Sequence, residues 1–170
     1  MAGPDDDINT GTVTRRMRAL AADIPLSVLV VDDDELERAL ISDRLAQRGI
    51  EVGQAENGAQ ALELLGREIV PVVVVDWHMP VMDGIEFTEK FRGANPGDTY
   101  VIMLTARKEE FDFERGYSAG VDDYLTKGVR ESELIARIHA GLHTYNLRVQ
   151  LRNARVALGA AQGARRRDAD

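Results

Sequence analysis

Apolar residues recur in short, continuous runs along this chain of 170 residues. Each run is followed by a longer segment in which apolar and polar positions alternate with helical spacing. Runs of this kind are typical of parallel strands that are buried on both faces of a sheet. The pattern predicts strands at Leu26–Val31, Glu51–Gln54, Pro71–Val75, Tyr100–Leu104 and Tyr124–Thr126.

The segments between the runs predict helices. Gly49 and Asn57 stand where a C-terminal and an N-terminal capping residue are needed. The helices are expected at Glu35–Arg48, Asn57–Arg67, Gly84–Phe91 and Lys108–Ala119, and from Glu131 onward. Strands and helices that alternate in this way predict an α/β fold with a doubly wound, five-stranded parallel sheet.

The chain extends beyond this alternating core at both ends. Residues 1–25 predict an N-terminal extension with a short amphipathic helix, which begins near Thr12 and ends before Pro25. Residues 26–143 are the predicted domain. Residues 144–170 are expected to continue the last helix and to end in a basic tail.

Two apolar stripes follow the extended last helix. The first contains Ile135, Ile138, Leu142, Tyr145 and Val149 and, after an interruption by Arg152, Val156. The second contains Leu147, Leu151, Ala154 and Leu158. The start of the first stripe would cover the sheet, but beyond Tyr145 we expect no sheet to be left. We therefore predict a coiled coil in this extension and a homodimer that forms through it, which Arg152 would weaken.

Composition and charge exclude several classes of protein. The net charge is −8 and the pI is near 4.9, which argues against binding to nucleic acid. The chain has no cysteine, so a thiol nucleophile or a thiolate metal site is excluded. No apolar run is long enough for a membrane span, and the acidic N-terminus does not resemble a secretory signal. We therefore expect a cytoplasmic protein.

Polar residues with matching chemistry follow the predicted strands. Asp32 and Asp33 follow the first strand, Asp76 the third, Thr105 the fourth and Lys127 the fifth. The carboxyl ends of parallel strands meet at one edge of a sheet, where ligands bind. Neighbouring carboxylates raise one another's pKa unless they share a proton or bind a cation, and Mg²⁺ suits such oxygen ligands. Asp76, alone on the central strand, is the natural nucleophile for an acyl phosphate.

Four motifs in order resemble those of the receiver domain of two-component response regulators. They are Val-Val-Asp-Asp at 30–33, Val-Asp-Trp-His-Met-Pro-Val-Met-Asp-Gly at 75–84, Leu-Thr-Ala at 104–106, and Gly-Val-Asp-Asp-Tyr-Leu-Thr-Lys at 120–127. The resemblance covers about residues 26–145. It implies a flavodoxin-like fold in which Asp76 accepts phosphate from a sensor histidine kinase or a phosphotransfer protein.

The resemblance also implies a role for each residue of the site. Asp33, Asp76 and the backbone carbonyl of His78 would bind Mg²⁺ directly, and Asp32 would reach the ion through water. The other site residues would bind the phosphoryl group: Thr105 by a hydrogen bond and Lys127 by an ion pair. The resemblance further implies a conformational switch, in which Tyr124 turns inward when Thr105 moves.

One residue departs from the family pattern beside the lysine. The family usually has proline after it, in a cis peptide bond, whereas this chain has Gly128. A cis bond before a residue other than proline costs about 2.5–4 kcal/mol. We therefore expect a trans bond between Lys127 and Gly128.

Three alternatives stand beside a receiver that acts as a signalling switch and is not itself an enzyme. The chain could be the receiver and linker of a longer regulator with an enzymatic output module, such as a diguanylate cyclase. A magnesium-dependent phosphatase with an aspartyl nucleophile is a less favoured alternative, in which a second aspartate normally follows the nucleophile by two residues. Here that place is Asp34 after Asp32, or His78 after Asp76. A flavin-binding module is disfavoured because no phosphate-binding loop follows the first strand.

Overall fold

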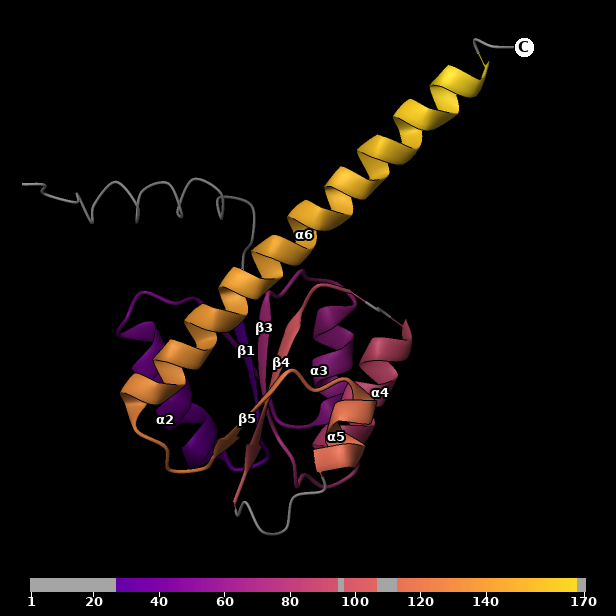
Figure 1. The fold of residues 1–170 in the computed structure, drawn as a ribbon. Helices are drawn as coiled ribbons and strands as arrows, with labels where there is room; N and C mark the ends of the chain where they lie inside the picture. Colours follow the sequence, from indigo (N-terminus) through magenta and orange to yellow (C-terminus); the bar gives the residue numbers. More distant parts are fainter. Residues whose placement is uncertain (1–26, 95–96, 107–112, 168–170) are drawn as a thin grey trace, which may run out of the picture.

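The computed structural model describes residues 27–94, 97–106 and 113–167. Its centre is a five-stranded parallel sheet in the order β2-β1-β3-β4-β5 (Figure 1). The strands are β1 (Val28–Val31), β2 (Val52–Ala55), β3 (Val72–Asp76), β4 (Tyr100–Thr105) and β5 (Asp123–Thr126). The helices are α2 (Glu35–Ala46), α3 (Gly58–Leu65), α4 (Gly84–Ala94), α5 (Phe113–Ala119) and α6 (Glu131–Arg167). The predicted doubly wound α/β fold is confirmed.

The sheet is buried on both faces because successive side chains of a strand point to opposite sides. Leu29 and Val31 join the core beneath α3, α4 and α5. Val28 and Val30 join the core beneath α2 and α6. None of these four residues has exposed surface, which explains why β1 is apolar at every position.

Local sequence signals determine where the helices begin. The side chain of Asn57 accepts a hydrogen bond from the backbone N–H of Gln60, so the predicted N-cap of α3 is confirmed. Asp34 caps α2 in the same way. Gly84 begins α4, where a Cβ atom would lie 2.4 Å from the carbonyl oxygen of Asp76. Glycine is therefore required for the helix to start directly against the end of β3.

Two predicted features lie outside the described residues. The first is the short helix of the N-terminal extension. The second is the beginning of the helix predicted at Lys108–Ala119, because the structure describes α5 from Phe113 onward.

The last helix is the longest element of the fold, with 37 residues. It crosses one face of the sheet and then projects away from it (Figure 1). Gly141 packs against the ring of Tyr100 at the start of β4, where a Cβ atom would lie 2.7 Å from a ring carbon. Because α6 begins near the carboxyl ends of the strands and crosses the start of β4, its projecting half leaves from the opposite edge of the sheet.

The base of this projection is fixed to the domain more firmly than the sequence predicted. Tyr145 is only 8% exposed. Arg148 pairs with Asp122 at 2.6 Å, and Arg152 pairs with Asp98. Tyr145 and Arg152 therefore take part in the packing of α6 on its own domain. The sequence interpretation missed this because the acidic partners come from loops distant along the chain.

Candidate functional site

The predicted site residues meet at the carboxyl edge of the sheet. Asp32 and Asp33 directly follow β1, Asp76 and Thr105 end β3 and β4, and Lys127 directly follows β5. Asp32 has no exposed surface, and Asp76 and Thr105 are 5% and 4% exposed. Asp33, by contrast, is exposed to solvent. The parallel register of the strands thus brings together residues that are up to 95 positions apart in the chain.

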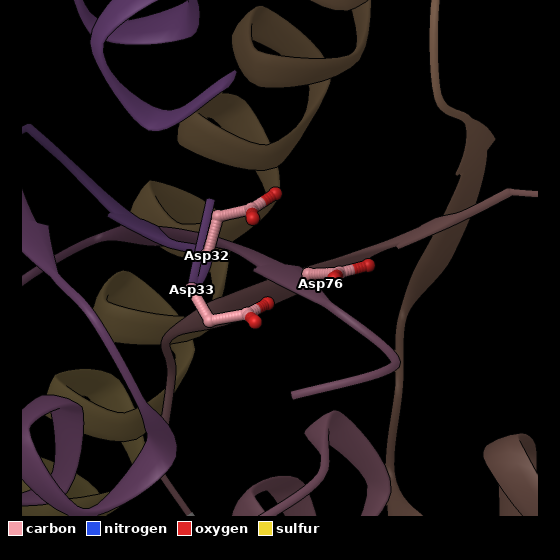
Figure 2. Close-up of side chains that lie close together, drawn as sticks. All are labelled: Asp32, Asp33 and Asp76. Atoms are coloured by element: carbon pink, nitrogen blue, oxygen red, sulfur yellow. The ribbon is translucent and has the colours of Figure 1, made fainter. Parts of the chain in front are cut away.

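Three carboxylates form an acidic pocket, which consists of Asp32, Asp33 and Asp76. One oxygen from each lies within 4.8 Å of the other two. The three side chains extend in the same general direction from the ends of neighbouring strands (Figure 2). Asp32 is held in place because its Oδ1 accepts a hydrogen bond of 2.9 Å from the backbone N–H of Asp34.

The ammonium of Lys127 supplies the positive charge beside the acidic pocket. Its Nζ lies 2.9 Å from Oδ2 of Asp32, 3.1 Å from Oδ2 of Asp76 and 2.7 Å from Oε2 of Glu37. Burial lowers the pKa of Lys127, but the hydrogen bonds to these carboxylates outweigh burial and raise it above its ordinary value. Lys127 is therefore charged at neutral pH.

Asp76 lies in an environment that opposes its negative charge. Burial raises the pKa of Asp76, and the charges of Asp32 and Asp33 raise it further. The hydrogen bond and the charge of Lys127 act in the opposite direction without cancelling the effect. A cation in the acidic pocket would relieve this repulsion, since a bound metal ion is the largest local charge at such a site.

Backbone hydrogen bonds fix the loops that carry the site. The N–H of Lys127 donates to the carbonyl of Thr105 at 2.8 Å, which joins the loop after β5 to the end of β4. The N–H of Trp77 donates to the carbonyl of Leu104 at 3.0 Å, and the N–H of Gly84 donates to the carbonyl of Trp77 at 2.8 Å. The ring of Trp77 stacks on that of His78, with ring centres 4.9 Å apart.

Two positions next to the site have a left-handed backbone. Gly128 has φ of +77°, a value that glycine adopts freely and proline cannot. No cis peptide bond occurs among the described residues, so the predicted trans bond before Gly128 is confirmed. Val81, in the loop after Asp76, has φ of +72° and is 87% exposed. A branched residue in this conformation stores strain in the loop between β3 and α4.

The structure places Tyr124 on β5 with its hydroxyl buried. Its ring makes an edge contact with the ring of Tyr117 on α5, at 5.4 Å between centres. Burial raises the pKa of the Tyr124 hydroxyl. Tyr124 therefore connects β5, the strand that precedes Lys127, with α5.

Glu37 is a site residue that the sequence analysis missed. It lies in the first turn of α2, which begins directly beside Asp32 and Asp33. Its carboxylate approaches Lys127 more closely than either Asp32 or Asp76 does. The available signal was its position one helical turn after Asp33, which places it on the helix end nearest the strand edge.

The acidic pocket suits a hard divalent cation. Carboxylate oxygens are the ligands that Mg²⁺ prefers, and the ion usually takes only one or two of them and keeps several waters. The exposure of Asp33 leaves room for such waters. The fold and the site thus define a doubly wound domain with three clustered carboxylates, one ammonium and one hydroxyl at the carboxyl edge of its sheet.

Comparison with known proteins identifies the family. The chain matches the response regulator receiver domain over residues 28–139 and belongs to that family. The heme response regulator HssR of Staphylococcus aureus is 41% identical over 119 residues, which cover 70% of this chain and 52% of HssR. The chain thus spans about half the length of the curated relatives that it matches.

Solved structures show the same similarity. The receiver domain of the Francisella response regulator 1452 is 36% identical, with a TM-score of 0.64 over 69% of this chain and 97% of that one. A structure described as adenylate cyclase from Rhodopirellula baltica is 28% identical, with a TM-score of 0.69 over 79% of this chain and 98% of that one. The flavodoxin-like receiver fold that the motifs implied is therefore confirmed. None of the helices in the described part of the chain has the length and apolarity that a membrane span requires.

Proposed function

We propose that this receiver domain takes a phosphoryl group onto Asp76 from a sensor histidine kinase or a phosphotransfer protein, with Mg²⁺ in the acidic pocket. The observation that carries the proposal is the position of Asp76. Its Oδ2 lies 3.1 Å from the ammonium of Lys127 and beside two further carboxylates. The same proposal includes a cytoplasmic location, shared with the donor of the phosphoryl group.

Each residue has a defined part in the transfer. A bond forms between a carboxylate oxygen of Asp76 and phosphorus, while the bond from phosphorus to the donor breaks and its electron pair leaves with the donor. Lys127 stabilises the charge of the transferred group, and the hydroxyl of Thr105 donates a hydrogen bond to it. Mg²⁺, held by Asp33, Asp76 and the His78 carbonyl and through water by Asp32, would neutralise the phosphoryl oxygens.

The proposed metal site can be tested through Trp77, which is the only tryptophan and adjoins Asp76. We expect its fluorescence to change as Mg²⁺ is added, because a divalent charge then arrives beside the ring. Asp33→Asn should raise the apparent Mg²⁺ dissociation constant at least about tenfold. Asp34→Asn is the matched control, since Asp34 caps α2 and asparagine is an equally good cap. Equal dissociation constants for both variants and the wild type would contradict the assignment.

We further propose that α6 joins two copies of the chain. Leu147, Leu151 and Leu158 are 51%, 54% and 62% exposed, and with Ala154 they repeat at heptad spacing. This stripe of four residues, the second of the two read from the sequence, stays exposed within the described part of the chain. Tyr145 and Arg152 hold the base of the helix, so the stripe can continue as a rigid extension of the receiver.

The dimer is tested by placing a charge in the stripe. We expect Leu151→Asp to raise the dimer dissociation constant at least about tenfold, because the carboxylate would be buried in the seam. Gln150→Asp adds the same charge at the neighbouring, exposed position and should change the dimer dissociation constant little. Sedimentation of both variants measures the effect. Wild-type protein that stays monomeric at high concentration would refute the seam.

We also propose a conformational switch that couples phosphorylation of Asp76 to the surface beside α5. Movement of Thr105 toward the phosphoryl group would change the packing of Tyr124 against Tyr117, and hence the surface beside α5. Such a switch requires the phosphoryl group to favour one arrangement over the other.

A second candidate function is a receiver and linker attached to an enzymatic output module. It is favoured by the projecting α6 and by the similarity to the structure described as an adenylate cyclase.

A further inference from the structure

Glu37 occupies one of the three hydrogen-bonding positions of the Lys127 ammonium. An ammonium group has three donors, and the structure assigns them acceptors on Asp32, Asp76 and Glu37. A phosphoryl group on Asp76 needs a donor from the same ammonium. At least one of the three carboxylates must therefore give up its contact when the phosphoryl group arrives.

Burial decides which carboxylate is released most easily. The side chain of Asp32 has no exposed surface and that of Asp76 is 6% exposed, whereas that of Glu37 is 40% exposed. A carboxylate that loses its partner while buried pays a large desolvation cost, but an exposed one is hydrated again by water. Asp76 also remains covalently joined to the phosphoryl group. Glu37 is thus the acceptor that yields.

We propose that Glu37 is a positioning residue that holds Lys127 in the unphosphorylated protein and competes with the phosphoryl group for its ammonium. The competition presupposes the proposed phosphoacceptor role of Asp76. In the unphosphorylated protein the contact with Glu37 holds the Lys127 ammonium against the first turn of α2. In the phosphorylated protein Lys127 releases Glu37 and donates to a phosphoryl oxygen in its place, so the lost contact with Glu37 lowers the stability of that state relative to the unphosphorylated one.

Beryllofluoride, which binds to an aspartate as a mimic of the phosphoryl group, tests the competition. The bound fraction is measured by fluorine NMR at saturating Mg²⁺. We expect Glu37→Gln to bind beryllofluoride about fivefold more tightly than wild type, as befits the loss of one partly exposed ion pair. Glu35→Gln removes the same charge from the same helical turn, at a position that makes no ion pair with Lys127 among the described residues. It should change the affinity less than about twofold.

A double-mutant cycle shows whether the effect passes through the lysine. In a Lys127→Ala background, Glu37→Gln should no longer change the affinity, because the shared partner is gone. The proposal is overturned if Glu37→Gln binds no more tightly than Glu35→Gln, or if its effect persists without Lys127. If wild-type protein binds beryllofluoride but the Glu37 variant matches it, only this inference fails. If wild-type protein binds none, the proposed function fails as well.

Discussion

Asp76→Asn is expected to reduce phosphorylation by a small phosphodonor such as acetyl phosphate at least about 100-fold, because the amide oxygen is a poor nucleophile. The side chain has nearly the same shape, so the acidic pocket keeps its geometry. Phosphate incorporation is measured by the intact mass of the protein with Mg²⁺ present.

Asp83→Asn provides the matched control for this experiment. Asp83 lies in the same loop after β3, and its side chain accepts a hydrogen bond of 2.7 Å from the Glu86 amide at the start of α4. Asparagine keeps that bond, so labelling should stay near the wild-type level. Wild-type labelling of the Asp76 variant would place the phosphoryl group on another residue.

The second large effect is expected on stability, at the edge of the sheet opposite the acidic pocket. Asp122 accepts hydrogen bonds from Arg92 at 2.7 Å, from Arg148 at 2.6 Å and from the backbone of Val101 at 2.8 Å. The side chains of Asp122 and Arg92 are only 13% and 18% exposed. Asp122→Ala should lower the free energy of unfolding by about 3 kcal/mol, because it leaves the largely buried guanidinium of Arg92 without its carboxylate partner.

Asp123→Ala is the control for this prediction. Asp123 is the next residue, and it pairs with Arg137 at 3.1 Å, where the arginine side chain is 46% exposed. An ion pair with an exposed partner contributes little, so the loss should stay below about 1 kcal/mol. Chemical denaturation of both variants measures the difference. Equal losses would mean that the contact between α6 and the sheet edge does not depend on the buried carboxylate.

The sequence was sufficient to predict the fold and the members of the acidic pocket, for a physical reason. Strands that are buried on both faces are apolar at every position, so β1, β3 and β4 were recognisable as continuous runs. Any polar residue that directly follows such a strand must lie at the carboxyl edge. The pattern of residues alone therefore places Asp32, Asp76 and Thr105 at the same edge of the sheet.

Contacts that depend on side-chain reach were not predictable in this way. Glu37 lies in the first turn of α2, and its position there indicates nearness to the strand edge but does not identify Lys127 as its partner. Tyr145 and Arg152 lie on positions that would continue an apolar stripe into a coiled coil. The structure shows them on the domain instead, because Asp98 and the neighbouring loops extend the surface that α6 covers.

The proposed function depends most directly on the identity of the phosphorylated residue. Wild-type protein is incubated with acetyl phosphate and Mg²⁺, and the acyl phosphate is then reduced with borohydride, which converts a phosphorylated aspartate to homoserine. Peptide mass spectrometry should find homoserine at Asp76 alone, and should find none when Mg²⁺ is removed by a chelator. Homoserine at Asp32 or Asp33, or undiminished conversion of Asp76 without Mg²⁺, would contradict the proposed function.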